Sequence, residues 1–176
     1  MKKLRLSNNQ REIIKAVGAL ALISASFFAP NILQVLKPKN DQHRYRFKRS
    51  LKRLVDKDFI YLFGEEIHLT KKGQELLKYI EVDDITFTSP EYWDGKWYLV
   101  CYDIPEFKKK ERDYFRSKLI QLGFKMIQDS LWVLPYNCKE EIAVIAQSLG
   151  IAPFVAYLTT DYLPQQQKLI WYFNLQ

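Results

Sequence analysis

The sequence contains a dense run of basic side chains that could bind a polyanion. Between residues 44 and 57 there are seven Lys or Arg residues and a single acid, Asp56. Guanidinium and ammonium groups bind phosphate oxygens, and Arg also reads the edges of bases. We expect phosphate contacts from Arg44, Arg46, Lys48 and Lys57, and base readout from Arg49, Lys52 and Arg53 together with Tyr45. The pattern predicts a surface for double-stranded DNA, and the alternative is a solvated basic face without a partner.

Asp103 is the second residue that could do chemistry, because it follows a continuous apolar run. A carboxylate at the end of a strand can hold Mg²⁺, which polarises a phosphodiester and activates water. One carboxylate per chain provides few ligands for a metal ion, since nucleases that use two metal ions have several acidic ligands. We therefore expect a structural Asp103 that caps the next helix or pairs with Arg112, and no cofactor. The alternative is a catalytic, metal-binding Asp103 with Mg²⁺, which would make the protein an endonuclease.

The basic run needs a helix over residues 41–57 to place its charges on one side. At about 100° per residue, one face of this helix is cationic. That face consists of Tyr45, Arg49, Lys52 and Arg53, with Arg46 at its edge. The opposite face is apolar and consists of Phe47, Leu51, Leu54 and Val55. Such a helix docks on a core and presents its charge outward, and Asp41 is a suitable N-cap for it.

Two short strands and a further helix are predicted after the basic helix. Residues 59–63 are apolar and aromatic, residues 64–66 form a turn, and residues 67–69 return as a second strand. Thr70 then caps a helix over residues 71–80. The order of elements predicts a winged helix-turn-helix domain over residues 1–80, with the basic helix in the major groove. Glu65 and Glu66 at the tip of the hairpin would repel phosphate, so this wing is not expected to grip DNA.

The first helix of this domain is expected over residues 8–28 and is unusually apolar. The apolar stretch from residue 16 to residue 36 reaches the length of a membrane span, about 20 residues. Pro30 and Asn31 interrupt the stretch, Glu12 precedes it, and basic residues flank both of its ends. A buried helix of a small core is therefore favoured, and a membrane anchor is the alternative that stays open.

The second half of the sequence predicts an α+β domain over residues 96–176, joined by a polar linker at residues 81–95. Strands are expected at residues 97–104, 124–128, 131–134 and 153–159, with helices at residues 107–122 and 139–149. The order βαββαβ is that of a ferredoxin-like domain, whose helices cover one face of the sheet. The other face is also apolar, and a second copy is its simplest cover. We therefore expect a homodimer, with residues 171–173 at its interface or against the sheet.

Charge is divided unequally between the two halves. Residues 1–90 contain 17 basic and 10 acidic residues, a net charge of +7, whereas residues 91–176 contain 10 of each. This asymmetry favours a polyanionic partner for the first half alone. The composition is that of a globular protein, and two cysteines, Cys101 and Cys138, provide no disulfide framework. A reducing, cytoplasmic setting is expected.

Several motifs in the second half resemble those of a known family. They are Trp93-Asp94-Gly95-Lys96-Trp97 and Asp103-Ile104-Pro105-Glu106, followed by Arg112, Gly123-Phe124, Gln128, Ser130 and Trp132. Over residues 90–160 the sequence resembles the central domain of the PaaX-type repressors of phenylacetate catabolism. That domain is similar to the small CRISPR-associated adaptation endonuclease. The resemblance implies an N-terminal winged helix, and it implies that Asp103 matches a proposed metal ligand shared by two copies.

Together these patterns predict a dimeric, DNA-binding transcriptional regulator of the repressor type. The basic helix would bind DNA, and the ferredoxin-like domain would hold two copies together. An endonuclease that depends on Asp103 is the alternative, and an adaptor held at a membrane by residues 16–36 is a third hypothesis. The neutral second half argues against the nuclease, because a domain that grips nucleic acid alone should be basic.

Overall fold

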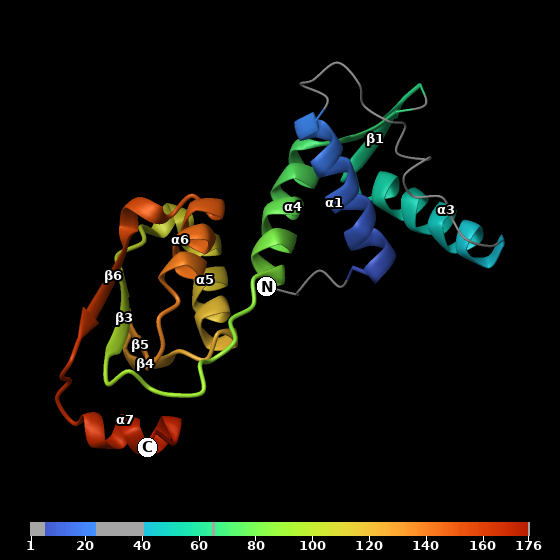
Figure 1. Cartoon of the computed structure of the whole chain (residues 1–176). Helices are drawn as coiled ribbons and strands as arrows, with labels where there is room; N and C mark the ends of the chain where they lie inside the picture. Colours follow the sequence, from blue (N-terminus) through green and yellow to red (C-terminus); the bar gives the residue numbers. More distant parts are fainter. Residues whose placement is uncertain (1–5, 24–40, 65, 176) are drawn as a thin grey trace. The chain divides into compact units, whose positions relative to one another are not determined.

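Figure 1 shows the computed structural model of the chain, which describes residues 6–23, 41–64 and 66–175. These residues form a mixed α+β structure with two antiparallel sheets, which confirms the predicted fold class at this level. The chain divides into two compact units, Met1–Glu81 and Val82–Gln176. Each unit has a hydrophobic core of its own, so the two are described one after the other.

The first unit consists of three described helices and a hairpin. The helices are α1 (Asn8–Ile23), α3 (Asp41–Asp56) and α4 (Lys71–Asp84), and the strands are β1 (Ile60–Phe63) and β2 (Glu66–Leu69). α1 begins with a capping box, in which Ser7 and Gln10 each accept a hydrogen bond from the other's backbone amide. The predicted continuation of this helix to residue 28 lies outside the described residues.

The apolar stretch at residues 16–36 is described only as far as Ile23. Among the helices that the structure describes, none combines the length and apolar character that a membrane crossing requires. α4 continues to Asp84, through residues that the sequence analysis assigned to the linker. Its last turn is anchored by Val82, which has no exposed surface.

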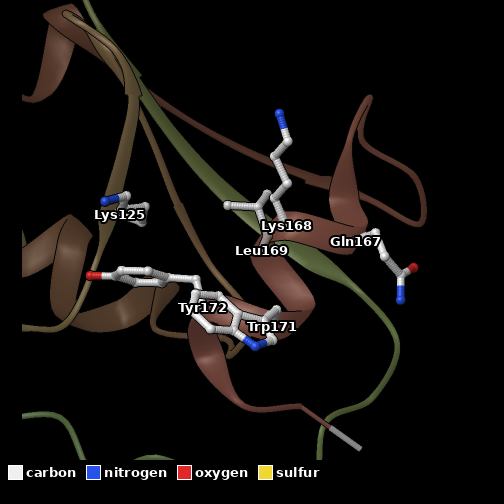
Figure 2. Close-up of a pocket in the computed structure, with 6 residues that line it drawn as sticks. All are labelled: Lys125, Gln167, Lys168, Leu169, Trp171 and Tyr172. Carbon is white, nitrogen blue, oxygen red and sulfur yellow. The ribbon is translucent and has the colours of Figure 1, made fainter.

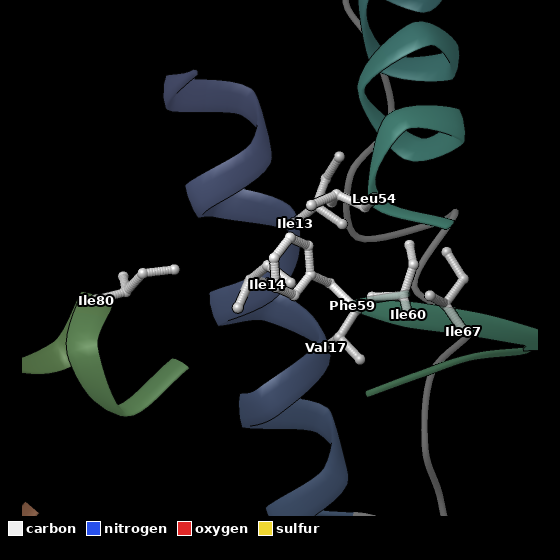
Figure 3. Packing of buried hydrophobic residues seen from close by; sticks show 8 residues of the cluster. All are labelled: Ile13, Ile14, Val17, Leu54, Phe59, Ile60, Ile67 and Ile80. Atoms are coloured by element: carbon white, nitrogen blue, oxygen red, sulfur yellow. The ribbon is translucent and has the colours of Figure 1, made fainter. Parts of the chain in front are cut away.

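The core of the first unit joins α1 and α3 to the hairpin. Figure 3 shows Ile13, Ile14 and Val17 of α1 gathered around Phe59 and Leu54. Ile14 and Leu54 are completely buried. Burying one such side chain contributes about 1.5–3 kcal/mol relative to leaving it exposed. The apolar side of α3 is therefore fixed, and its other side is left to face solvent.

Thr70 and Gly73 connect the hairpin to α4. The hydroxyl oxygen of Thr70 accepts a hydrogen bond from the amide of Gly73 (3.0 Å), which confirms the predicted N-cap of α4. The same hydroxyl donates to the carbonyl of Asp58 (2.7 Å). A Cβ atom at Gly73 would lie 1.9 Å from the carbonyl oxygen of Phe59, so this close approach requires glycine.

The second unit is a four-stranded sheet with three helices. The strands are β3 (Trp97–Tyr102), β4 (Lys125–Gln128), β5 (Leu131–Leu134) and β6 (Val155–Thr160). The helices are α5 (Lys109–Gln121), α6 (Lys139–Ser148) and α7 (Gln166–Phe173), with short 3-10 helices η1 (Glu106–Lys108) and η2 (Ala152–Phe154). The strands lie in the order β4-β5-β3-β6, and all neighbours are antiparallel. β3 is therefore a central strand.

β3 is buried on both faces, as its continuous apolar sequence predicts. Alternate residues of a strand point to opposite faces of the sheet. Tyr102 packs edge-on against Phe115 of α5, with ring centroids 5.6 Å apart, so its face is the one that α5 covers. Trp97 and Leu99 lie on the opposite face, where they cluster with Val133 of β5.

α7 covers part of this opposite face, and the sequence analysis did not predict it as a helix. The ring of Phe173 lies 6.3 Å from that of Trp97, so this residue of the tail packs against the sheet, which is one of the two places expected for residues 171–173. Trp171 and Tyr172 do not share this burial, since 84% and 52% of their surfaces stay exposed. Leu158 of β6 is also 53% exposed, although it pairs with the buried Leu99. α7 therefore leaves part of the face open.

Candidate nucleic-acid interface

The predicted DNA-binding residues lie on the exposed side of α3. We call this set the α3 basic surface; it comprises Arg44, Tyr45, Arg46, Lys48, Arg49, Lys52 and Arg53. All of these residues are exposed, and Tyr45 keeps 68% of its surface accessible. Lys57 is exposed as well but lies in the turn that follows the helix. One helix thus presents all the predicted residues except Lys57.

The opposite side of α3 is held by the core of the first unit. Leu54 is completely buried, and Phe47 and Leu51 are partly buried against the same cluster. Val55 was predicted on this apolar face, but it is 38% exposed. It lies about 100° around the helix from Leu54, too far to reach the core. The assignment of Val55 to the apolar face is therefore wrong, and the buried stripe is narrower than predicted.

The α3 basic surface has the charge and dimensions needed to contact DNA. In the part of the chain that the structure describes, no carboxylate forms an ion pair with Arg49, Lys52 or Arg53. A helix of 16 residues is about 24 Å long, and the major groove, about 12 Å wide, admits one α-helix. Cations that neutralise phosphates release condensed counterions, which supplies most of the non-specific binding free energy.

The C-terminal end of α3 fixes the position of Lys57. The amides of Asp58 and Phe59 donate to carbonyls of the last helical turn (2.8 and 2.9 Å), which is a Schellman motif. Asp58 adopts the left-handed backbone of this motif, at φ 59°. The ammonium group of Lys72 donates to the carbonyl of Lys57 (2.7 Å). These bonds hold the backbone at Lys57 while its own side chain stays exposed.

The hairpin of the first unit offers phosphate no Lys or Arg, since residues 59–70 contain neither. His68 hydrogen-bonds Glu66 (3.0 Å) and stacks on Tyr61, with ring centroids 5.2 Å apart. Leu62 and Phe63 are 54% and 74% exposed. Glu65, which we placed at the tip with Glu66, lies outside the described residues. The described part of the hairpin is therefore acidic and apolar.

Asp103 lies directly after β3 with an exposed side chain, and its amide donates to the carbonyl of Phe154 (3.0 Å). Arg112 donates instead to the carbonyl of Ile104 (3.1 Å) and to the carboxylate of Glu106 (2.7 Å). Neither η1 nor α5 has a side-chain cap. Both structural roles expected for Asp103 are therefore wrong, because Glu106 is the carboxylate that Arg112 reaches.

The surroundings of Asp103 provide few further ligands for a metal ion. Hydrogen bonds from Arg112 and Lys109 hold the pKa of Glu106 below its usual range, so this carboxylate is ionised and already paired with cations. In the described ranges of the chain, no three His, Cys, Asp or Glu side chains gather as a metal site. A metal at Asp103 would need ligands from a second copy, as in the shared site that the family resemblance implies.

The Trp-Asp-Gly-Lys-Trp motif forms a turn before β3. Asp94 accepts hydrogen bonds from the amide of Lys96 (2.9 Å) and from the hydroxyl of Tyr98. The indole N–H of Trp93 donates to the carbonyl of Lys96 (2.8 Å), and its ring packs on Trp97. The hydrogen bond to Asp94, with burial, raises the pKa of Tyr98 to about 12. No role was predicted for Tyr98 from the sequence, although its hydroxyl completes the turn by donating to Asp94.

Comparison with protein families gives a match for the second unit. Residues 90–169 match the family model described as the PaaX protein central Cas2-like domain. The matched range contains the motifs that carried the resemblance in the sequence, all four strands of the larger sheet and the start of α7. No curated protein matches the chain.

Proposed function

We propose that the chain is a transcriptional regulator that binds double-stranded DNA. The premise is that it is a PaaX-type protein, because residues 90–169 match the Cas2-like central domain of that family. Phenylacetate catabolism is the process that the family suggests. The second unit carries the family signature but no excess charge, since residues 91–176 hold 10 basic and 10 acidic residues. We therefore assign DNA binding to the first unit.

The α3 basic surface is the observation that carries this proposal. α1, α3, the hairpin and α4 follow the order of a winged helix-turn-helix domain, with α3 as the recognition helix. Its apolar side is occupied by the core, and its cations are exposed. Arg49, Lys52 and Arg53 would read bases, while Arg44, Arg46, Lys48 and Lys57 would contact phosphates and Tyr45 would assist.

The second unit is proposed to be a ferredoxin-like domain that holds two copies together. The strand order β4-β5-β3-β6, with α5 and α6 as the connecting helices, supports this assignment. The face opposite α5 is only partly covered by α7, and Leu158 remains 53% exposed there. A second copy would bury this surface, and a two-fold dimer would bind two half-sites related by the same symmetry.

Selection from a random pool of DNA duplexes tests the proposed function. The full chain should enrich a site with two related half-sites, and its affinity should fall steeply as salt increases. The double variant Lys52→Ala/Arg53→Ala should lose binding, whereas Lys96→Ala should retain it, because Lys96 is an exposed lysine of the neutral unit. No binding to any duplex at low salt would refute the proposal.

An endonuclease that uses Asp103 is the second candidate. Its support is the exposed Asp103 after β3, inside a Cas2-like domain. Two copies could share one Mg²⁺ between their Asp103 carboxylates and so activate water. The test is incubation of plasmid DNA and RNA with Mg²⁺ or Mn²⁺. Cleavage by the native chain that Asp103→Asn abolishes would establish the nuclease, and equal behaviour of the two proteins would remove it.

A further inference from the structure

A hollow of about 530 Å³ lies beside α7 in the second unit. It is lined by one residue of β4 and five of α7, namely Lys125, Gln167, Lys168, Leu169, Trp171 and Tyr172, and we call it the α7 hollow. Figure 2 shows the ammonium groups of Lys125 and Lys168 pointing apart. The two lysines therefore contribute their apolar stems to the hollow and place their charges at its rim.

The α7 hollow has the anatomy of a protein–protein contact, which is an apolar centre with a polar rim. Trp171 is 84% exposed and Tyr172 is 52% exposed, and these residue types dominate the binding free energy of such contacts. The ammonium group of Lys125 lies 4.4 Å from the ring centroid of Tyr172, which holds this charge at the rim. The sequences of α7 and β4 contain no Asp or Glu. A matching partner surface is therefore aromatic in its centre and acidic beside it.

The hairpin of the first unit presents this complementary chemistry. Phe63 of β1 pairs directly with Glu66 of β2, so both side chains project from the same face of the hairpin. Phe63 is 74% exposed, and 70% of the Glu66 side chain is exposed. Tyr61 and His68 are a second such pair, with stacked rings 5.2 Å apart. We call these four residues the hairpin outer face. Residues 59–70 contain neither Lys nor Arg.

We propose that the hairpin outer face of one copy of the chain docks on the α7 hollow of another copy. The ring of Phe63 would pack on Trp171, and the carboxylate of Glu66 would lie beside Lys168. The ammonium group of Lys168 donates to the side-chain oxygen of Gln165 (2.8 Å) and has two further N–H groups for this carboxylate. Two α7 hollows facing each other would instead bring four lysines together, which opposes that pairing.

This contact goes beyond the proposed function, because neither the α3 basic surface nor the sheet face at Leu158 takes part in it. Four side chains are far fewer than the 20–30 residues per side of a standard interface, so we expect a dissociation constant of about 0.1–1 mM. The contact is therefore unpopulated at the micromolar concentrations that measure the proposed dimer. Because two different surfaces meet, it can continue from copy to copy when copies are concentrated, as on neighbouring DNA sites.

Sedimentation equilibrium of the full Leu158→Lys chain at up to about 1 mM tests the proposal. This background removes the proposed sheet-face contact and keeps both docking surfaces. The chain should associate weakly, and adding Phe63→Ser or Trp171→Ser should reduce the association constant at least about fivefold. Tyr92→Ser is the control, because this ring is 79% exposed outside both surfaces, and it should change the constant less than about twofold. With Leu158 retained, Phe63→Ser and Trp171→Ser should likewise reduce growth beyond the dimer.

An exchange of charges identifies the two surfaces as partners. Glu66→Lys and Lys168→Glu should each reduce association, because each places like charges at the contact. The double variant Glu66→Lys/Lys168→Glu should recover it, because opposite charges meet again. Glu66→Lys/Lys96→Glu is the matched control, since Lys96 is exposed outside both surfaces, and it should not recover association. Circular dichroism checks that each variant is folded.

Three results would overturn the proposal. They are a Leu158→Lys chain that stays monomeric at about 1 mM, association that Phe63→Ser leaves unchanged, and a charge exchange that does not recover it. Loss of association in Trp171→Ser together with no effect of Phe63→Ser would assign the α7 hollow to a different surface. Arg49→Ala should impair duplex binding and leave association intact, so a failure of the proposed function is distinguishable from a failure of this contact.

Discussion

The ammonium group of Lys118 donates a hydrogen bond to the carbonyl oxygen of Ile85 at 2.6 Å, inside the second unit. It also donates to the carbonyl of Asp83 at 2.9 Å, and only 3% of Lys118 is exposed. The last carbonyls of a helix have no intrahelical donor. At the end of α4 the buried ammonium group of Lys118 donates hydrogen bonds to two such carbonyls. Tyr114, one turn earlier on α5, donates to the carboxylate of Asp83 (2.6 Å). α5 thereby holds the chain at residues 82–85.

Lys118→Met should therefore destabilise the second unit. The thioether side chain keeps most of the volume but removes the buried donor of two carbonyls, which should cost about 1.5–3 kcal/mol. Urea unfolding followed by tryptophan fluorescence measures the difference. Lys109→Met is the matched control on the same helix, because its pairing with Glu106 is exposed to solvent and contributes little to stability. Equal stability of the two variants would contradict the role assigned to Lys118.

Tyr98 should make the stability of the second unit depend on pH in the alkaline range. Its folded pKa of about 12 lies above the ordinary value of 10.0, chiefly because its hydroxyl donates to Asp94. The neutral hydroxyl is therefore favoured by folding. The stabilisation is complete below about pH 10 and is lost as the pH rises towards 12. Asp94→Asn should lower the pKa of Tyr98, which the ultraviolet absorbance of its phenolate measures.

Subtracting the titration of Tyr98→Phe isolates this one tyrosine from the other ten. An unchanged phenolate titration in Asp94→Asn would show that burial alone raises the pKa of Tyr98. The same variant keeps a side-chain oxygen that can accept the amide of Lys96, so the turn before β3 should stay folded while the pKa of Tyr98 changes.

The sequence predicted those elements whose positions follow from local periodicity and capping. The helix at residues 41–57 was correct because its apolar residues recur with the helical period, and Thr70 was a correct cap because its hydroxyl needs only the next turn. The spacing of Ser7 and Gln10 in the sequence also indicates a capping box, which was not predicted. Such features depend on neighbours within about four residues.

The errors lie where distant residues decide the structure. α4 runs on to Asp84 because Lys118, 33 residues after Ile85, binds the carbonyls at its end. α7 has only eight residues and follows Pro164, and its stability comes from Phe173 packing on Trp97. The sequence alone does not distinguish Asp103 from Glu106 as the partner of Arg112. Only the path of the chain after β3 places Glu106 within 2.7 Å.

Leu158→Lys should convert the proposed dimer into a monomer without unfolding it. Leu158 is 53% exposed on the face that α7 leaves open. A lysine there would stay hydrated in a single copy, but it would lose its water between two copies and so destabilise the dimer. Sedimentation velocity measures the oligomeric state, and circular dichroism checks the fold. Val144→Lys is the control, because Val144 is 51% exposed on α6 and lies on another element. A native chain that is monomeric at all concentrations would remove the proposed dimer.

Arg49 and Lys48 should differ in how they affect DNA recognition, although they are neighbours on α3. Arg49 lies in the middle of the cationic face, where its guanidinium can pair with a guanine edge, so Arg49→Ala should reduce discrimination at one base pair by about 1–3 kcal/mol. Lys48 lies towards the side of the helix, where an ammonium group meets phosphate. Lys48→Ala should weaken all duplexes equally and lower the slope of log affinity against log salt by about one.

Competition titrations with the selected site and single-base variants of it, each at several salt concentrations, measure both quantities for both proteins. Neither variant should change the thermal unfolding midpoint appreciably, since both side chains are exposed. If Arg49→Ala instead weakens every duplex to the same degree, Arg49 contacts only phosphate, and another face of α3 must read the bases. If neither variant changes affinity while duplex binding persists, α3 is not the recognition helix.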